Sequence, residues 1–194
     1  MLKGHERQGY AVITENAADD GTITEAVAAG VLTSHVVSFT GSRGNSAVEE
    51  WAGDTLEDSE EDTTGDVKLE LSQLSLKDEA ALGGHTYDST KDLMTESASD
   101  TAPFVRYAAI GLGRRGATKG AMTNYWRLLM YYKVKFGPAD DTMQTKEKTS
   151  SFKNHSLTAT LYPNAQGKMR DKQDFTTFEA ALAAAKTFLN IATV

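Results

Sequence analysis

Alternation of apolar and polar residues along much of the chain predicts β-strands. In residues 67–71 every second side chain is apolar, and residues 128–136 repeat this pattern over a longer stretch. A strand of this kind has one buried and one exposed face. Further strands are expected at 9–15, 31–40, 104–112 and 156–161. The turn residues Ala52-Gly53-Asp54 predict a hairpin between strands at 47–51 and 55–60.

Two segments have helical signals. Ser75 is a predicted N-cap with Asp78 in the first turn, and Gly83-Gly84 ends this short helix. A longer helix is predicted over residues 177–190, after a capping box formed by Thr176-Thr177-Phe178-Glu179. Its apolar residues recur at helical spacing: Phe178, Ala181, Leu182, Ala185, Phe188 and Leu189. The many alanines make this helix slim enough to lie on a sheet.

The pattern as a whole predicts a mainly β (α+β) fold, a β-sandwich with a packed helix and long loops. Loops are expected at 16–22, 41–46, 88–102, 114–123, 138–150 and 163–173. A length of 194 residues suits one hydrophobic core, so we predict a single domain over 1–194. No apolar run approaches the roughly 20 residues that span a bilayer, and the N-terminus lacks the apolar centre of a secretion signal. We therefore expect a protein of the cytoplasm in which it is made, with no membrane partner.

The net charge of −7 conceals a strong polarity along the chain. Residues 47–66 contain nine acids and no base, whereas residues 114–172 contain twelve Lys or Arg against four acids. Such blocks are commonly solvated surface. The alternative is that the acidic block of one copy contacts the basic block of the next, and a head-to-tail contact builds rings or filaments. The candidate assembly residues are Glu49, Glu50, Asp54, Glu57, Asp58, Glu60, Glu61, Arg114, Arg115 and Lys119.

One motif points to a different chemistry. Gly111-Leu112-Gly113-Arg114-Arg115-Gly116 matches the G-x-G-x-x-G pattern of dinucleotide-binding proteins. That chemistry requires a helix to begin at the motif, so that its N-terminal amides face the pyrophosphate. Here Gly120 interrupts such a helix, and residues 125–136 have a strand pattern. We expect the glycines to loosen a connection between two strands, and a nucleotide-dependent enzyme remains the alternative.

Other reactive groups give no pattern. The chain has no cysteine, and its four histidines lie far apart. The acidic stretch 58–63 has Thr63 where a calcium-binding EF-hand loop needs glycine. A nucleic-acid face would have to use residues 114–172, yet their Lys and Arg alternate with core residues and the whole chain is acidic. We expect no catalytic residue, no cofactor and no metal.

Five segments, taken in order, resemble the major tail protein family of siphophages that infect Gram-positive bacteria. They are GYAVITENAADDGT, SAVEEWAGD, GDVKLELSQLSLKDEAALGGHTYD, DTAPFVRYAAIGL and NYWRLLMYYKVKFGPADDTMQTKEKTSSFKNHSLTATLYP. The resemblance covers roughly residues 8–163. The loop at 114–123 is longer and more basic than the family pattern, and the helix at 177–190 lies beyond the matching region.

The resemblance implies a structural protein that is not an enzyme. Its β-sandwich would be of the tail-tube type, whose inner sheet joins those of five neighbours in a hexameric ring. Rings would stack with the help of a tape-measure protein, next to tail terminator and distal tail proteins, and DNA would cross the bore in transit. The protein would be made in the bacterial host cytoplasm and reside in the virion tail. The alternative within this class is another virion or injection-machine ring protein, such as a tail terminator.

Overall fold

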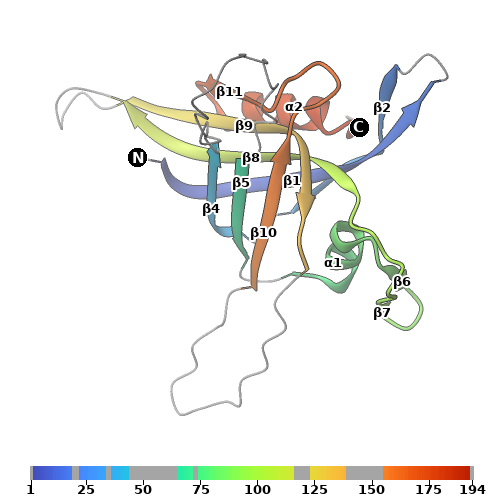
Figure 1. Cartoon of the computed structure of the whole chain (residues 1–194). Coiled ribbons are helices and arrows are strands. Elements are labelled where there is room, and N and C mark those ends of the chain that lie inside the picture. Colours follow the sequence, from blue (N-terminus) through green and yellow to red (C-terminus); the bar gives the residue numbers. More distant parts are fainter. Residues whose placement is uncertain are drawn as a thin grey trace, which may run out of the picture.

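The computed structural model describes residues 2–18, 22–33, 36–43, 65–71, 74–115, 123–138 and 155–192. Strands dominate these residues, and two helices accompany them (Figure 1). In chain order the elements are β1 (Leu2–Ala17), β2 (Ile23–Val27), β3 (Val31–Thr33), β4 (Val36–Arg43), β5 (Gly65–Leu71), α1 (Leu76–Gly83), β6 (Thr86–Asp88), β7 (Leu93–Thr95), β8 (Phe104–Arg115), β9 (Thr123–Phe136), β10 (His155–Tyr162), β11 (Arg170–Phe175) and α2 (Phe178–Phe188).

All strands except β6 and β7 belong to one antiparallel sheet in the order β2-β1-β8-β9-β10-β5-β4. The long strand β9 has two different partners on one side, β11 along residues 126–131 and β10 along residues 133–136. In Figure 1, β4, β5 and β10 run across the direction of β8 and β9. The sheet therefore folds over itself into two layers, and the predicted mainly β fold is confirmed.

The main core lies between the two layers. The alternation in β5 explains one side of it, because Val67 and Leu69 are buried whereas Asp66 and Lys68 are exposed. Leu82 of α1 joins the same core, whose other members are Tyr10, Val67, Leu69, Val105, Tyr107, Ala109, Tyr131, Val134, Phe136, Leu157, Ala159 and Leu161. The hydroxyl of Tyr10 donates to the Asp78 carboxylate at 2.7 Å, which links β1 to α1.

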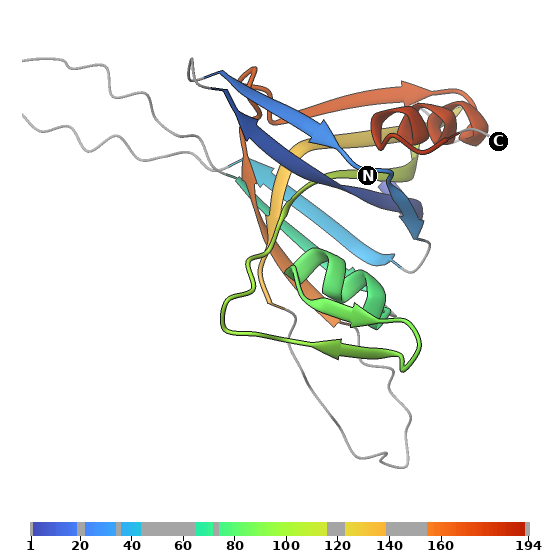
Figure 2. The same ribbon diagram turned by 90° about the vertical axis from the view of Figure 1, so that its right-hand side faces the viewer.

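Helix α2 packs on the outer face of β8 and β9, as its alanine-rich sequence predicts. Ala181, Ala185 and Leu189 are buried against Ala108 and Ile110 of β8. The rings of Trp126 and Phe178 meet edge to face at 5.0 Å between their centroids. Figure 2 shows α1 and α2 on different sides of the folded sheet. Neither helix in the described part of the chain is long and apolar enough to cross a membrane.

The caps of α1 are those predicted, but the start of α2 is not. Ser75 caps α1 by accepting from the Asp78 amide at 3.1 Å, and Gly84 ends it in the left-handed conformation at φ 77°. In α2 the N-cap is Thr177, whose hydroxyl accepts from the Ala180 amide at 3.3 Å. The predicted capping box from Thr176 to Glu179 is therefore wrong by one residue, because it is the side chain of Thr177 that satisfies the first free amide.

Several strand boundaries differ from the predicted ones. The single strand expected at 31–40 is two strands with different partners, since β3 pairs with β1 and β4 pairs with β5. The loops expected at 88–102 and 163–173 contain β7 and most of β11. Strands β1, β4 and β8 extend by two or three residues into expected loops, and β9 extends by one. The hairpin predicted from 47–51 and 55–60 lies outside the described residues.

Candidate assembly surface

The candidate assembly residues chosen from the sequence fall unevenly on the structure. Arg114 and Arg115 lie at the end of β8. Lys119 and the acidic candidates lie outside the described residues; those acids are Glu49, Glu50, Asp54, Glu57, Asp58, Glu60 and Glu61. The contact between an acidic and a basic block therefore stays a prediction.

The described residues of the basic block at 114–172 do not form one surface, because strand alternation sends their side chains to different faces. Lys133 and Lys135 both approach the ring of Phe104, with 4.3 Å and 5.7 Å between the ammonium nitrogen and the ring centroid. Lys133 also pairs with Glu15 at 2.5 Å. Lys168 lies 5.8 Å from the centroid of another ring, that of Tyr132. These lysines are held by aromatic rings and one acid.

Four other cations gather where β11 pairs with β9. In this ladder Arg170 lies opposite Tyr131, Lys172 opposite Leu129, and Asp174 opposite Arg127. Residues at every second position share a face, so all six side chains are on the face that also contributes the buried Tyr131 to the core. Arg115 reaches the same place from β8. We name Arg115, Arg127, Arg170 and Lys172 the cation cluster.

Asp174 is the carboxylate at the centre of the cation cluster. Arg127 donates to it twice, from Nε to Oδ1 at 2.7 Å and from Nη2 to Oδ2 at 2.8 Å. Arg115 Nη2 donates to the same Oδ2 at 2.8 Å. The hydrogen bonds from Arg127 and the charges of both guanidiniums hold the pKa of Asp174 below its ordinary value. The same bonds raise the pKa of Arg127.

Tyr125 orients the two arginines that bind Asp174. The guanidinium carbons of Arg115 and Arg127 each lie 5.1 Å from the centroid of the Tyr125 ring. This ring in turn covers Gly113, its partner in the β8–β9 ladder, where a Cβ would come within 2.3 Å of the ring. Contacts of cations with an aromatic face restrict the long arginine side chains and stabilise them.

The glycine motif therefore has a different role from the one predicted. Gly111 and Gly113 lie inside β8, where they pair with Arg127 and Tyr125 of β9. The prediction that they loosen a connection between strands is wrong for these two glycines, and Gly116 lies outside the described residues. Pyrophosphate binding requires a helix that begins at the motif. In the described part of the motif the backbone belongs to a strand instead.

Lys172 and Arg170 are the other two cations of the cluster. Burial, followed by the nearby charges of Arg170 and Arg127, lowers the pKa of Lys172. Arg170 hydrogen-bonds to the hydroxyl of Tyr131. Within the described residues Lys172 forms no ion pair. Four cations thus face a single carboxylate, and the described part of this face is strongly positive.

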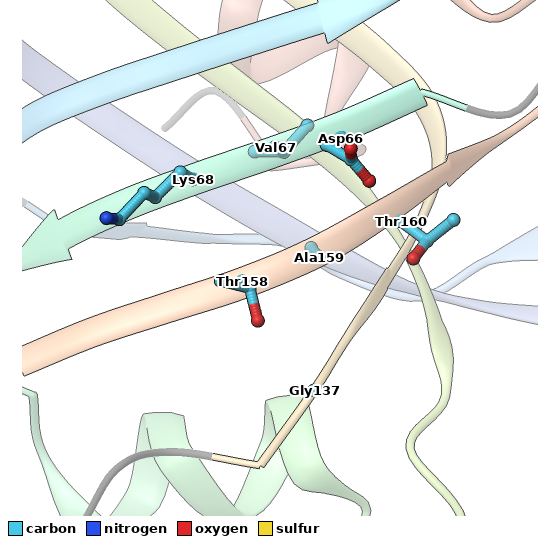
Figure 3. Close-up of a pocket in the computed structure, with 7 residues that line it drawn as sticks. All are labelled: Asp66, Val67, Lys68, Gly137, Thr158, Ala159 and Thr160. Carbon is cyan, nitrogen blue, oxygen red and sulfur yellow. The ribbon is translucent and has the colours of Figure 1, made fainter. Parts of the chain in front are cut away.

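A groove of 370 Å³ lies on the outer side of β5 and β10 (Figure 3). The ladder places Asp66 opposite Thr160 and Lys68 opposite Thr158, and the backbone of Gly137 borders the groove. The side chains of Asp66, Lys68 and Thr158 are exposed to solvent. No group of three or more His, Cys, Asp or Glu in the described ranges is arranged to hold a metal ion. The groove is an open polar trough with one charge of each sign.

His85 contacts two acidic side chains. Its Nδ1 lies 2.9 Å from Asp100 Oδ2, and its Nε2 lies 3.9 Å from Glu96. The hydrogen bonds that Asp100 accepts from His85 and from the Ser97 amide hold its pKa below the ordinary value. These contacts fasten the chain that follows β7 to the end of α1.

Most of the cation cluster was missed in the sequence. Only Arg115 was among the candidates, whereas Arg127, Arg170 and Lys172 were not. The residues that contact the arginines, Tyr125 and Asp174, were missed as well. The available signal was the placement of Arg170, Lys172 and Asp174 at every second position, which a strand turns into one charged face. Pairing with β9 joins this face to Arg127.

Comparisons of the chain with protein-family models, with curated proteins and with solved structures gave no match. The structure defines its class at the level of the fold: a mainly antiparallel β protein whose sheet folds over itself and carries a packed helix.

Proposed function

We propose that this chain is the structural subunit of a phage tail tube, which assembles with identical copies into stacked hexameric rings around a channel for DNA. The family resemblance of residues 8–163 suggests this function, and the folded-over antiparallel sheet is compatible with it. The observation that carries the proposal is that the two layers have outer faces of opposite character. The layer of β8 and β9 is covered by α2, whereas that of β5 and β10 exposes polar side chains.

The polar face suits a channel through which DNA moves. Asp66, Lys68, Thr158 and Thr160 combine hydroxyl groups with one charge of each sign. Affinity for nucleic acid depends mainly on cations that neutralise phosphates, so a face of this composition holds DNA weakly. A basic lining would retain the passing polyanion.

The edge of the same layer offers a way to join copies. Among the described strands, β4 forms a ladder only with β5, although it also contacts β1. An edge strand can pair with a strand of another molecule through its free amides and carbonyls. Pairing at β4 would continue the polar face from one copy to the next.

Electron microscopy of the purified chain after concentration tests the proposal, together with sedimentation to measure the mass of the assembly. We expect hexameric rings or hollow tubes. A species that stays monomeric even at millimolar concentration would contradict the proposal, and rings that never stack would favour a tail terminator or a similar ring protein. Saturable binding in a titration with a nicotinamide or adenine nucleotide would favour the enzyme alternative.

A further inference from the structure

The cation cluster is a positive face on an acidic protein. It combines Arg115, Arg127, Arg170 and Lys172 with one carboxylate, Asp174, while the whole chain has a net charge of −7. Asp174 already accepts from both Arg115 and Arg127. The described residues therefore leave most of this positive charge uncompensated.

The geometry of the cluster is suited to binding carboxylates. The side chain of Arg115 is 73% exposed, and that of Arg127 is 29% exposed, so both remain accessible beside Asp174. Their contacts with Tyr125 hold the guanidiniums in place. A pre-ordered arginine loses less conformational entropy when it binds an anion, and the planar group fits a carboxylate in two-point contacts.

The chain itself contains a segment of complementary charge. Residues 44–64, between β4 and β5, hold eight acids and neither Lys nor Arg. We name them the acidic segment. A chain of this length that is tethered at both ends can extend about 35 Å from its anchors, using about 3.4 Å per residue in each direction. This reach is sufficient to contact a neighbouring molecule.

We propose that the cation cluster is the docking site for the acidic segment of a second copy of this chain. The inference rests on the proposed function, to which it adds the surface that receives the neighbour. Donor and acceptor surfaces differ, so the contact is head-to-tail and repeats from copy to copy instead of closing a dimer. Charge complementarity of this kind fixes register and orientation between partners.

Complementation between two charge-reversed variants tests the proposal. The first carries Glu57→Lys, Asp58→Lys, Glu60→Lys and Glu61→Lys, and the second carries Arg115→Glu and Lys172→Glu. We expect each variant alone to fold but not assemble, as checked by circular dichroism and electron microscopy. An equimolar mixture should assemble, because the four introduced lysines then meet the cluster with two introduced glutamates, while the unchanged acidic segment meets the unchanged cluster. A mixture that stays unassembled although the wild-type chain forms tubes would overturn the proposal.

A matched control variant separates the effect of the cluster on assembly from the effect of net charge. The variant Lys91→Glu, Lys168→Glu has the same net charge as Arg115→Glu, Lys172→Glu but changes exposed lysines outside the cluster. We expect this control to assemble like the wild type. Loss of assembly in both variants would show that net charge decides, and would also overturn the proposal.

A peptide-binding measurement tests the site independently of tube formation. The host protein carries Glu57→Gln, Asp58→Asn, Glu60→Gln and Glu61→Gln, so that its own segment competes less. A fluorescent peptide of residues 44–64 should bind this host about tenfold more tightly than it binds the host with Arg115→Glu and Lys172→Glu added. Adding Lys91→Glu and Lys168→Glu instead should leave the affinity unchanged.

The peptide result distinguishes failure of the docking site from failure of the tail-tube function. Cluster-dependent binding by a protein that never forms rings would support the site and contradict the tube. Equal binding to all three hosts, with wild-type tubes present, would contradict the site and leave the tube. An oligodeoxynucleotide of equal charge that binds the cluster more tightly than the peptide would overturn the proposal in favour of a nucleic-acid partner.

Discussion

Gly9 and Gly30 determine how closely the end of α2 approaches the first strands. A Cβ at Gly9 would lie 2.5 Å from the carbonyl oxygen of Val31 and 2.7 Å from Leu189. A Cβ at Gly30 would lie 2.4 Å from the carbonyl oxygen of Leu189. The fully buried Leu189 thus occupies the space that side chains at these positions would need.

Gly9→Ala should lower the free energy of unfolding by about 1–3 kcal/mol, because the added methyl group meets a backbone oxygen that cannot move alone. Urea unfolding followed by circular dichroism measures this change. Gly137→Ala is the control, since a Cβ there would make an ordinary contact of 3.4 Å with Thr158. An equal loss in both variants would show that the close approach at Gly9 is not the cause.

The N-cap of α2 is a second test at the level of a residue. Thr177→Ala should reduce stability by about 1 kcal/mol, because the Ala180 amide loses its acceptor. Thr176→Ala should change stability by less than about 0.5 kcal/mol. Thermal or urea unfolding of the two variants decides between the observed cap and the capping box predicted from the sequence. A larger loss of stability in Thr176→Ala than in Thr177→Ala would support the capping box.

Asp174 predicts a pH dependence. Its pKa in the folded protein is below the ordinary value of 3.8, mainly because Arg127 donates hydrogen bonds to the carboxylate. A depressed pKa stabilises the fold above the unfolded-state pKa, and this contribution is lost as the pH falls through the folded-state pKa. Asp174→Asn should therefore weaken the wild-type decline in stability between about pH 5 and pH 3. Parallel urea midpoints for both proteins across this range would contradict the assigned role.

At the scale of elements, the sequence predicted the strands that bury one regular face. Residues 67–71 alternate because one face of β5 lies in the main core. Residues 128–136 are also a strand, but there Leu128 packs with α2 whereas Val134 and Phe136 lie in the main core. Strand β11 was missed because its sequence, RDKQDF, exposes four polar residues in a row. Its strand conformation depends on pairing with β9, which is distant in sequence and leaves no local pattern.

The candidate site was less predictable than the fold for the same reason. Charge counting located a basic block but could not divide it between faces. Lys133 and Lys135 lie with Phe104, whereas Arg127 and Lys172 lie together only because β11 returns to β9. Strand register therefore determines which residues each charged side chain contacts, and register cannot be predicted from composition.

The alanines of α2 predict a difference between its two faces. Ala185 is buried against the sheet, whereas Ala183 is exposed. Ala185→Leu should reduce the free energy of unfolding by about 1–3 kcal/mol, because the larger side chain pushes the helix away from β8. Ala183→Leu should change it by less than about 0.5 kcal/mol, as measured by urea unfolding. Equal tolerance at both positions would mean that α2 is not closely packed.

At the scale of the whole molecule, association between copies depends more on how charge is distributed along the chain than on the net charge. The acidic segment and the cation cluster lie on different parts of the chain, and a net charge of −7 alone would make identical copies repel one another. Association between copies then depends on bringing the two unlike surfaces together.

The proposed assembly should weaken as salt is added. Between about 0.05 and 1 M NaCl the Debye length falls to about 3 Å, which screens exposed charges. Sedimentation should show fewer and shorter assemblies at the higher salt concentration, while circular dichroism stays constant. Growth of the assemblies with salt would contradict an electrostatic contact, because apolar association is not weakened by screening.

The contact of Leu189 with Gly9 has a consequence for how the protein is synthesised. Strand β1 leaves the ribosome shortly before its partners β2 and β3, but its third ladder partner, β8, and its covering helix α2 are translated much later. Pairing between parts so distant in sequence is intrinsically slow, and a nascent chain meanwhile exposes unpaired strand edges. The sheet around β1 can therefore be completed only after α2 has been translated, so the interval between the synthesis of β1 and that of α2 is the one in which this part of the chain most needs a chaperone.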